Sequence, residues 1–214
     1  MKQPDFLHIA LTFDDGYLDH YNIAKLLAHL RIKATFFVIT HLTRYQGRVL
    51  LASRPDKIRE MFRMGHEIGS HSCTHPNLLN ITPQKLEEEL KDSKLFLESL
   101  LESDVPGFAY PWGIYSSRVA KIVKKYYSYA RTTHNLGEDM WNVSCNDRYR
   151  INSFGTRHLM KLPLKLVQYS TSLKPVIMLH HEGPTRVLLL IRSFRFLYPK
   201  VKFITLKEMA EFID

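Results

Sequence analysis

The stretch FLHIALTFDDG, residues 6–16, places an apolar, β-prone run directly before two aspartates and a glycine. The run from Phe6 to Phe13 has the composition of a buried strand, and Asp-Gly is a common turn pair where a strand ends. Adjacent carboxylates on extended backbone point in different directions, so one can bind a metal while the other faces water or substrate. By itself, however, Asp14-Asp15 is also typical of an ordinary turn.

Short β-prone runs alternate with longer helical patterns along the rest of the chain. The predicted strands are Leu7–Phe13, Ala34–Ile39, Glu67–Ser70, Gly107–Tyr110, Tyr129–Thr132, Tyr149–Ser153, Pro175–His180 and Lys200–Ile204. The predicted helices are Tyr21–Leu30, Pro55–Met64, Pro83–Leu101, Ser117–Tyr126, Leu159–Leu173, Arg186–Leu197 and Leu206–Ile213. Alternation of this kind implies a parallel sheet covered by helices, either open and doubly wound or closed as a barrel.

Polar and aromatic side chains gather where the predicted strands end. Asp14, Asp15, Pro111, Trp112 and His180 all lie at carboxyl ends of these strands. That is the face on which α/β barrels build active sites from several strands, so the placement favours a barrel. No internal repeat or Gly/Ser-rich linker divides the sequence, and we therefore predict a single domain over residues 1–214.

The net charge of the chain is +9, and its basic residues concentrate in the second half. This charge fits a solvated helix face that maintains solubility. It also fits attraction to an anionic surface or substrate, such as a phospholipid leaflet contacted peripherally or a sugar diphosphate. No helix-turn-helix, zinc-finger or aromatic RNA-binding motif accompanies the charge, so we expect no nucleic-acid partner.

The sequence contains no apolar run of about 18 residues, which excludes an obvious membrane-spanning helix. Residues 1–5, MKQPD, have neither the long apolar core nor the small-residue cleavage site of a secretory signal. The two cysteines, Cys73 and Cys145, are too few for a disulfide framework. These features predict a cytoplasmic protein.

Two histidines at i and i+4 change the interpretation of the aspartates. His71 and His75 lie in SHSCTHP, residues 70–76, where a tight loop can bring both rings to one side. Together with Asp14-Asp15 they supply enough ligands for a metal and a spare base. Three protein ligands with an open fourth position are typical of catalytic metal centres.

The chain resembles the polysaccharide deacetylases of the carbohydrate esterase family 4 type. The matching segments follow in the family's order: TFDDG (12–16), HSCTHP (71–76), FAYPWG (108–113) and VIMLH (176–180). The closing segment VKFITLKEM (201–209) also reads like that family's last strand and helix. The resemblance spans about Phe6 to Ile213 and implies a distorted (β/α) barrel of seven to eight mostly parallel strands.

The resemblance implies roles for the metal and for proton transfer. Asp15, His71 and His75 would hold a divalent metal ion, commonly Zn²⁺ in this family. Asp14 would be the general base that takes a proton from the attacking water. His180 would be the general acid that protonates the leaving amine.

It also implies how the rest of the site is built. The backbone amide of Tyr110 would stabilise the oxyanion, and Trp112 with Pro111 would form part of the wall around the acyl group. Many members orient the catalytic aspartate with an arginine in the third motif, and FAYPWG has none. We predict that Arg150 substitutes for it. One of Glu138, Asp139 and Asp147 is expected to pair with His180, and Asp147 is our choice among them.

The function implied is a metal-dependent hydrolase that removes an N-acetyl or similar N-acyl group from an amino sugar. A cytoplasmic enzyme would meet this sugar in a saccharide, a nucleotide sugar or a lipid-linked glycan precursor. Two alternatives remain open at this point. One is a hydrolase of small non-sugar amides such as cyclic ureides or imides, and the other is a catalytically inactive carbohydrate-binding relative.

Overall fold

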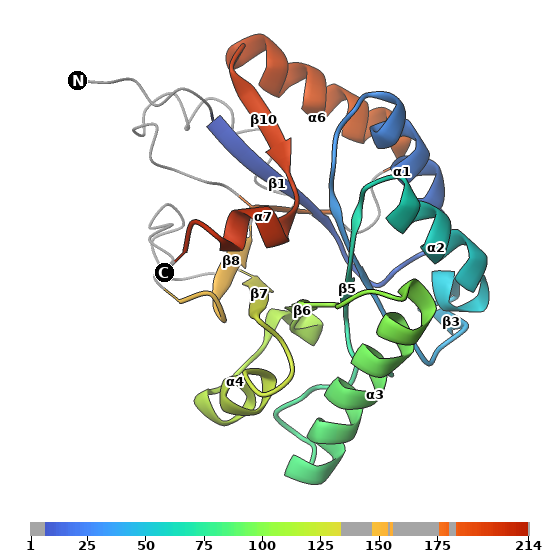
Figure 1. The fold of residues 1–214 in the computed structure, drawn as a ribbon, viewed down its shortest axis with the longest axis vertical. Helices are drawn as coiled ribbons and strands as arrows, with labels where there is room; N and C mark the ends of the chain where they lie inside the picture. Colours follow the sequence, from blue (N-terminus) through green and yellow to red (C-terminus); the bar gives the residue numbers. More distant parts are fainter. Residues whose placement is uncertain (1–6, 134–146, 154, 156–175, 180–182, 214) are drawn as a thin grey trace.

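The computed structural model describes residues 7–133, 147–153, 155, 176–179 and 183–213, and Figure 1 shows their arrangement. The strands are β1 Leu7–Phe13, β2 Thr35–Val38, β3 Arg44–Tyr45, β4 Arg48–Val49, β5 Glu67–Ser70, β6 Gly107–Ala109, β7 Tyr129–Thr133, β8 Ile151–Ser153, β9 Val176–Leu179 and β10 Val201–Ile204. The α-helices are α1 His20–His29, α2 Pro55–Arg63, α3 Pro83–Leu101, α4 Ser117–Val123, α6 Pro184–Leu197 and α7 Leu206–Ala210. Two short 3-10 helices are η1 Leu51–Ser53 and η2 Pro111–Gly113.

The main sheet is parallel and has the order β10-β1-β2-β5-β6-β7-β8, with β9 also paired to β1. One edge of β1 is shared along its length: residues 7–10 pair with β10 and residues 10–13 pair with β9. Because β9 also contacts β8, the sheet curls back on itself with helices outside it (Figure 1). This confirms the predicted distorted (β/α) barrel.

The predicted elements that fall on described residues match the structure to within a few residues. The predicted helix Leu159–Leu173 lies outside the described residues. The sequence patterns missed the small β3–β4 hairpin, whose strands are only two residues each. Strands this short carry no measurable alternation of apolar and polar side chains, so periodicity cannot detect them.

Helix starts follow local capping chemistry. The Thr82 hydroxyl accepts a hydrogen bond from the Lys85 amide at 3.2 Å, and Pro83 occupies the first helical position of α3. At α7, Thr205 and Glu208 form a capping box in which each side chain accepts from the other's backbone amide. Both caps confirm the predicted helix starts.

The largest core cluster joins the apolar faces of α1, α2, α3 and α6 to the strands β1, β2, β5 and β9. Ile9, Leu11 and Phe13 alternate along one face of β1 in this cluster and are nearly inaccessible to solvent. Packing on the outer face of β1 fixes the direction of the strand and therefore the position of the aspartates that follow it. Among the described residues, no helix is long and apolar enough to cross a bilayer.

Candidate active site

The end of β1 places two aspartates in different environments. The Asp14 amide continues the sheet by donating to the Leu179 carbonyl of β9 at 3.1 Å. Asp15 then turns away with a φ of 68°, and Gly16 follows with a φ of 71°. A Cβ on Gly16 would lie 3.1 Å from Val38, so glycine is required both by the backbone angle and by the close approach of β2.

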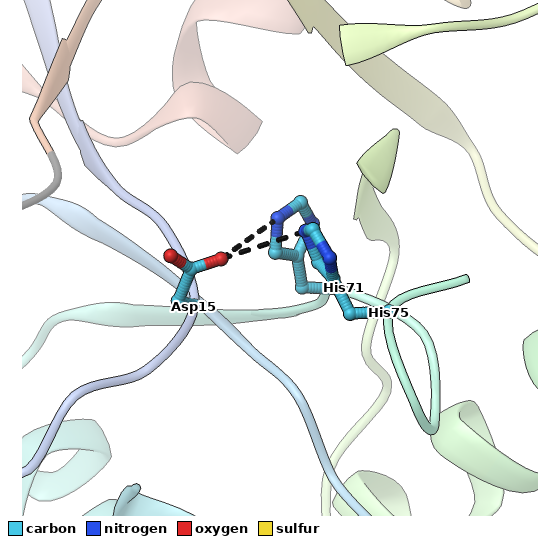
Figure 2. A group of neighbouring side chains, drawn as sticks. All are labelled: Asp15, His71 and His75. Atoms are coloured by element: carbon cyan, nitrogen blue, oxygen red, sulfur yellow. Dashed lines mark ion pairs between the residues drawn. The ribbon is translucent and has the colours of Figure 1, made fainter. Parts of the chain in front are cut away.

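Asp15, His71 and His75 converge on one point, as Figure 2 shows. Asp15 Oδ1 lies 3.5 Å from His71 Nε2 and 3.5 Å from His75 Nε2. All three side chains are buried, and their candidate ligand atoms lie within 4.8 Å of one another. His71 follows β5 directly and His75 closes the loop after it, so both belong to the same end of the sheet as Asp15.

Each imidazole is held through its other ring nitrogen. His71 Nδ1 lies 2.8 Å from the Ala109 carbonyl oxygen, and that contact requires a proton on Nδ1. His75 Nδ1 lies 2.9 Å from the hydroxyl of Tyr45 on the β3–β4 hairpin. Burial lowers the pKa of His71 and, with its neighbour His71 adding to the effect, lowers the pKa of His75 to about 3. Both rings are therefore neutral near pH 7 and direct Nε2 towards Asp15.

This donor set fits a small divalent cation. Bonds of about 2.0–2.1 Å at tetrahedral angles place two ligand atoms on one Zn²⁺ about 3.4 Å apart. The two Nε2–Oδ1 separations of 3.5 Å match that spacing. Neutral imidazoles and a carboxylate are the ligands that zinc takes in open catalytic sites, and hydrogen-bonded Nδ1 atoms are the usual support.

The loop between the two histidines is held by a buried carboxylate. Glu89 of α3 accepts hydrogen bonds from the Cys73 and Thr74 amides, both at 2.9 Å, and from the Thr74 hydroxyl at 2.6 Å. The loop needs this support because Ser72 and His75 have φ values of 65° and 58°, in the left-handed region. Glu89 thereby fixes the backbone that carries His75 towards the site.

Asp14 is held by Arg131, a fully buried residue of β7. Arg131 Nη2 lies 2.5 Å from both carboxylate oxygens of Asp14, and Nη1 donates to the Ser153 hydroxyl of β8 at 3.0 Å. A buried ion pair of this kind is stable only with good geometry and further hydrogen bonds, which Ser153 supplies. Arg131 therefore fixes the direction of the Asp14 carboxylate.

The prediction that Arg150 orients Asp14 is corrected by this pair. Arg150 precedes β8, and its side chain is about half exposed, with Nε 3.3 Å from an Asp147 oxygen. Its guanidinium also lies over the Tyr115 ring at 5.5 Å. Arg150 lies just before the amino end of β8, whereas Asp14 lies just after the carboxyl end of β1. Because the strands are parallel, the two residues lie at opposite ends of the barrel.

The predicted oxyanion donor, the Tyr110 amide, is also corrected. This N–H donates to the Arg131 carbonyl at 3.0 Å and so continues the β6–β7 pairing. The Tyr110 ring is buried, and its hydroxyl donates to the Tyr149 carbonyl at 3.1 Å. The amide two residues later, that of Trp112, donates to no backbone carbonyl of the described residues.

The turn after β6 presents Trp112 beside the candidate metal ligands. Trp112 has a φ of 61°, its side chain is 55% exposed, and its ring lies 5.1 Å from that of His75. Pro111 is buried and begins η2, so it shapes the turn and presents no surface to a ligand. Gly113 closes the turn, where a Cβ would lie 1.9 Å from Thr133 Oγ1.

His180, the predicted general acid, lies outside the described residues. Its role, and its pairing with Asp147, stay predictions. Asp147 itself accepts a hydrogen bond from the Tyr149 amide at 2.9 Å and pairs with Arg150.

Sequence reasoning missed Arg131, Glu89 and Tyr45. A signal for Arg131 was present: an arginine inside an apolar strand must find a buried partner, because burying an unpaired charge is costly. Glu89 stands in a run of three consecutive glutamates on α3, and Tyr45 belongs to a hairpin with no sequence pattern of its own. Neither of these two could be singled out before the tertiary structure.

Comparisons with known proteins agree with the fold. A family model described as "Polysaccharide deacetylase" matches residues 2–129, which is more than half of the chain. The chain therefore belongs to the polysaccharide deacetylase family. The matched region contains Asp14, Asp15, both metal-site histidines and Trp112, while Arg131 lies just beyond it.

Curated relatives include two deacetylases. The chain is 32% identical over 133 residues to the chitooligosaccharide deacetylase of Sinorhizobium fredii, covering 56% of this chain and 58% of that protein. It is 31% identical over 119 residues to the peptidoglycan-N-acetylglucosamine deacetylase of Bacillus cereus, covering 55% and 52%. The chain thus spans about half the length of the curated relatives that it matches.

Among solved structures, a family 4 acetyl xylan esterase from Clostridium thermocellum, determined with a cobalt ion, has the same fold. Its TM-score is 0.67 at 20% identity, covering 96% of this chain and 91% of that one.

Proposed function

We propose that this chain is a metal-dependent hydrolase that removes an N-acetyl or similar N-acyl group from an amino sugar. The observation that carries the proposal is the division of labour at the end of β1. Asp15 joins two neutral histidines in a metal-sized triangle, while Asp14, one residue earlier, is paired with Arg131. The family membership and the deacetylases among the relatives support amino-sugar glycans as the substrate class.

Amide hydrolysis needs a base, an acid and stabilisation of the oxyanion. A divalent cation held by Asp15, His71 and His75, most simply Zn²⁺, would supply Lewis-acid polarisation of the acyl carbonyl and ease deprotonation of water. Asp14 would accept the proton of the attacking water on a carboxylate oxygen, a contribution worth roughly 10²–10⁴-fold in rate. Arg131 balances the charge of Asp14 and fixes the direction of its carboxylate.

The turn of residues 110–113 would complete the site. The Trp112 amide would donate to the developing oxyanion, and one such donor contributes about 3–4 kcal/mol to transition-state stabilisation. The exposed Trp112 indole would form a wall against the acyl group or the sugar ring. His180 would protonate the leaving amine, as the sequence motif implies.

The chemistry of the proposed site defines the substrate only as an N-acylated amino sugar. A saccharide, a nucleotide sugar or a lipid-linked glycan precursor all present an N-acylated amino sugar to such a site. The charge of the chain mildly favours the phosphorylated or membrane-associated members of this group.

The test separates metal binding from turnover. Metal-free protein would be titrated with Zn²⁺ and assayed on N-acetylglucosamine oligomers, a nucleotide-linked N-acetylglucosamine and a cyclic ureide. Asp14→Asn is expected to bind Zn²⁺ within about threefold of wild type while losing at least about 100-fold in turnover. The matched variant Asp15→Asn is expected to lose Zn²⁺ affinity by at least about 100-fold.

Each alternative has its own outcome. Loss of Zn²⁺ from Asp14→Asn would show that the roles of the two aspartates are wrongly divided. Turnover of the ureide alone would exclude the amino-sugar substrate. A wild-type protein that binds no divalent metal and hydrolyses none of the three would be an inactive relative.

A further inference from the structure

Two segments of the chain contain basic residues and no acidic ones. Residues 20–33 and 183–207 together contain nine lysines and arginines and no aspartate or glutamate. The whole chain has 30 basic and 21 acidic residues, so the remainder holds 21 of each. The net charge of +9 is therefore the charge of these two segments.

The two segments adjoin on the outside of the barrel. The first contains α1 and the second contains α6 and β10, and Figure 1 shows α6 beside α1. Arg195 of α6 donates to the Leu30 carbonyl at the end of α1 at 3.4 Å. Lys33 is partly compensated, because it pairs with Glu208 at 3.0 Å. The two basic segments are therefore neighbours on the outside of the barrel.

Exposed apolar side chains project from α6, which lies within the second basic segment. Phe196 is 85% exposed, more than any other large apolar side chain of the described residues, and Leu189 is 58% exposed. The two are seven residues apart on α6 and so lie on the same helix face, two turns apart. The opposite face of α6 is fully used by the core, through Val187, Leu190, Ile191 and Phe194.

Exposed arginines interleave with the two apolar side chains. Arg192 lies three residues after Leu189 and four before Phe196, which puts it on the same face. Arg186 lies one turn before Leu189. An exposed helix face with apolar residues at its centre and arginines around them is the pattern of helices that lie in the interface of an anionic membrane.

We propose that the α6 face, defined as Arg186, Leu189, Arg192, Arg195 and Phe196, binds peripherally to an anionic phospholipid surface. A second copy of the chain is a poorer occupant, because a symmetric contact would bring two basic faces together. Nucleic acid is a poorer occupant as well, because the apolar centre of the face has no counterpart on a phosphate backbone. The proposal is independent of the reaction that the chain catalyses.

The test is cosedimentation of the full chain with vesicles. Wild type is expected to bind vesicles of about 70:30 phosphatidylcholine and phosphatidylglycerol, and not phosphatidylcholine alone, at about 0.1 M salt. Binding should weaken as the salt is raised to about 0.5 M. Arg186→Gln with Arg192→Gln should weaken it about 25-fold, since each basic residue contributes about fivefold. Leu189→Ser with Phe196→Ser should weaken it at least about tenfold.

Matched variants control for charge and for exposed apolar surface elsewhere. Lys91→Gln with Lys121→Gln removes the same charge from α3 and α4, and Leu95→Ser removes a leucine that is 52% exposed on α3. Both controls are expected to bind like wild type. Thermal unfolding of each variant checks that the protein is folded. We expect every variant to fold, because all the substituted residues are exposed.

Three results would overturn the proposal. The first is the absence of binding to the anionic vesicles, and the second is equal loss of binding in the α3 and α4 controls. The third is a dimer, measured by light scattering, that the Leu189→Ser with Phe196→Ser variant abolishes, because that would assign the face to a second copy.

Discussion

The two ends of the barrel each bury a carboxylate, and they treat its charge in opposite ways. At the carboxyl end, Asp14 meets the guanidinium of Arg131 at 2.5 Å. At the amino end, Glu67 of β5 accepts hydrogen bonds from the Tyr129 hydroxyl, from Thr35 Oγ1 at 2.7 Å and from the Lys207 amide at 2.9 Å. Burial raises the pKa of Glu67 to about 7 despite these hydrogen bonds.

The different partners of the two carboxylates distinguish a candidate catalytic residue, Asp14, from a structural one, Glu67. Glu67 of β5 links β7 to the start of α7 through its hydrogen bonds with Tyr129 and Lys207. Thr35 Oγ1 accepts a further hydrogen bond from the Leu206 amide at 2.8 Å, so the short last helix covers the amino end of the barrel. Neutral hydrogen bonds are enough for that task. In its proposed role as general base, Asp14 would have to stay ionised, and a buried carboxylate stays ionised most readily beside a cation. The buried arginine partner thus supports placing the proposed site at the carboxyl end of the barrel.

The largest expected effect comes from breaking the buried pair. Arg131→Met should lower the free energy of unfolding by about 3–5 kcal/mol, because it leaves the Asp14 charge buried without its partner. The proposed deacetylase activity should fall at least about 100-fold. Urea unfolding and the oligomer assay measure the two effects.

Two further variants separate the orienting role of Arg131 from its contribution to the stability of the fold. Arg150→Met, which breaks the half-exposed pair with Asp147, should change stability by no more than about 1 kcal/mol and activity by less than about threefold. Arg131→Met combined with Asp14→Leu should regain much of the lost stability without regaining activity. A larger loss of activity in Arg150→Met than in Arg131→Met would return the orienting role to Arg150.

A smaller effect, dependent on pH, is expected at the amino end. The pKa of Glu67 is raised in the folded state to about 7, so its contribution to stability is present below about pH 4.5 and is lost as the pH rises to about 7. A shift of this size corresponds to about 3 kcal/mol. Glu67→Gln, which cannot ionise, should therefore gain about that much relative to wild type between pH 4.5 and pH 7.5.

The difference between the two unfolding curves isolates this carboxyl group. His71 and His75 have lowered pKa values, so they contribute the opposite slope: stability is lost as the pH falls below about 6.5. Both proteins share that slope, and it cancels in the difference. A difference that stays constant from pH 4.5 to pH 7.5 would mean that Glu67 is not the titrating group.

The smallest effect on stability is expected in the loop that carries the histidines. Glu89→Gln keeps the shape of the side chain but loses one acceptor, which should lower the free energy of unfolding by about 1–2 kcal/mol. Zn²⁺ affinity should fall about tenfold, because the loop then holds His75 less firmly. Competition with a chelating dye measures the affinity, and metal-free unfolding measures the stability.

Glu88→Gln provides the matched control, since Glu88 is the neighbouring residue on α3 and pairs with Lys85 at the surface. It should leave Zn²⁺ affinity unchanged. If Glu89→Gln were less stable but bound Zn²⁺ as tightly as wild type, Glu89 would support the fold and not the geometry of the histidines.

Much of the fold could be predicted because its signals are local. The strand Leu7–Phe13 and the helix Pro83–Leu101 were predicted with the bounds that the structure shows, since an apolar run, a Thr cap and a first-turn proline are all read within a few residues. The hairpin of β3 and β4 could not be predicted, because two-residue strands are specified by packing and not by pattern. That hairpin nevertheless carries Tyr45 to His75.

The candidate site likewise contains residues that local motifs predict and one residue that only the structure identifies. Asp14, Asp15, His71, His75 and Trp112 stand in short motifs, and the structure brings them together. The sequence favours Arg150 as the orienting arginine because it lies near the start of a predicted strand. The structure assigns that role to Arg131, 117 residues from Asp14 along the chain.

The sequence by itself determined which residues are available for chemistry, because ligand spacing, turn glycines and the residues that follow strands are properties of adjacent positions. Only the tertiary structure decided how these residues are oriented. Closure of the sheet sets β7 across from β1, and the packing of α3 sets Glu89 against the histidine loop. Contacts between distant segments depend on the register and curvature of the whole barrel, which no local pattern specifies.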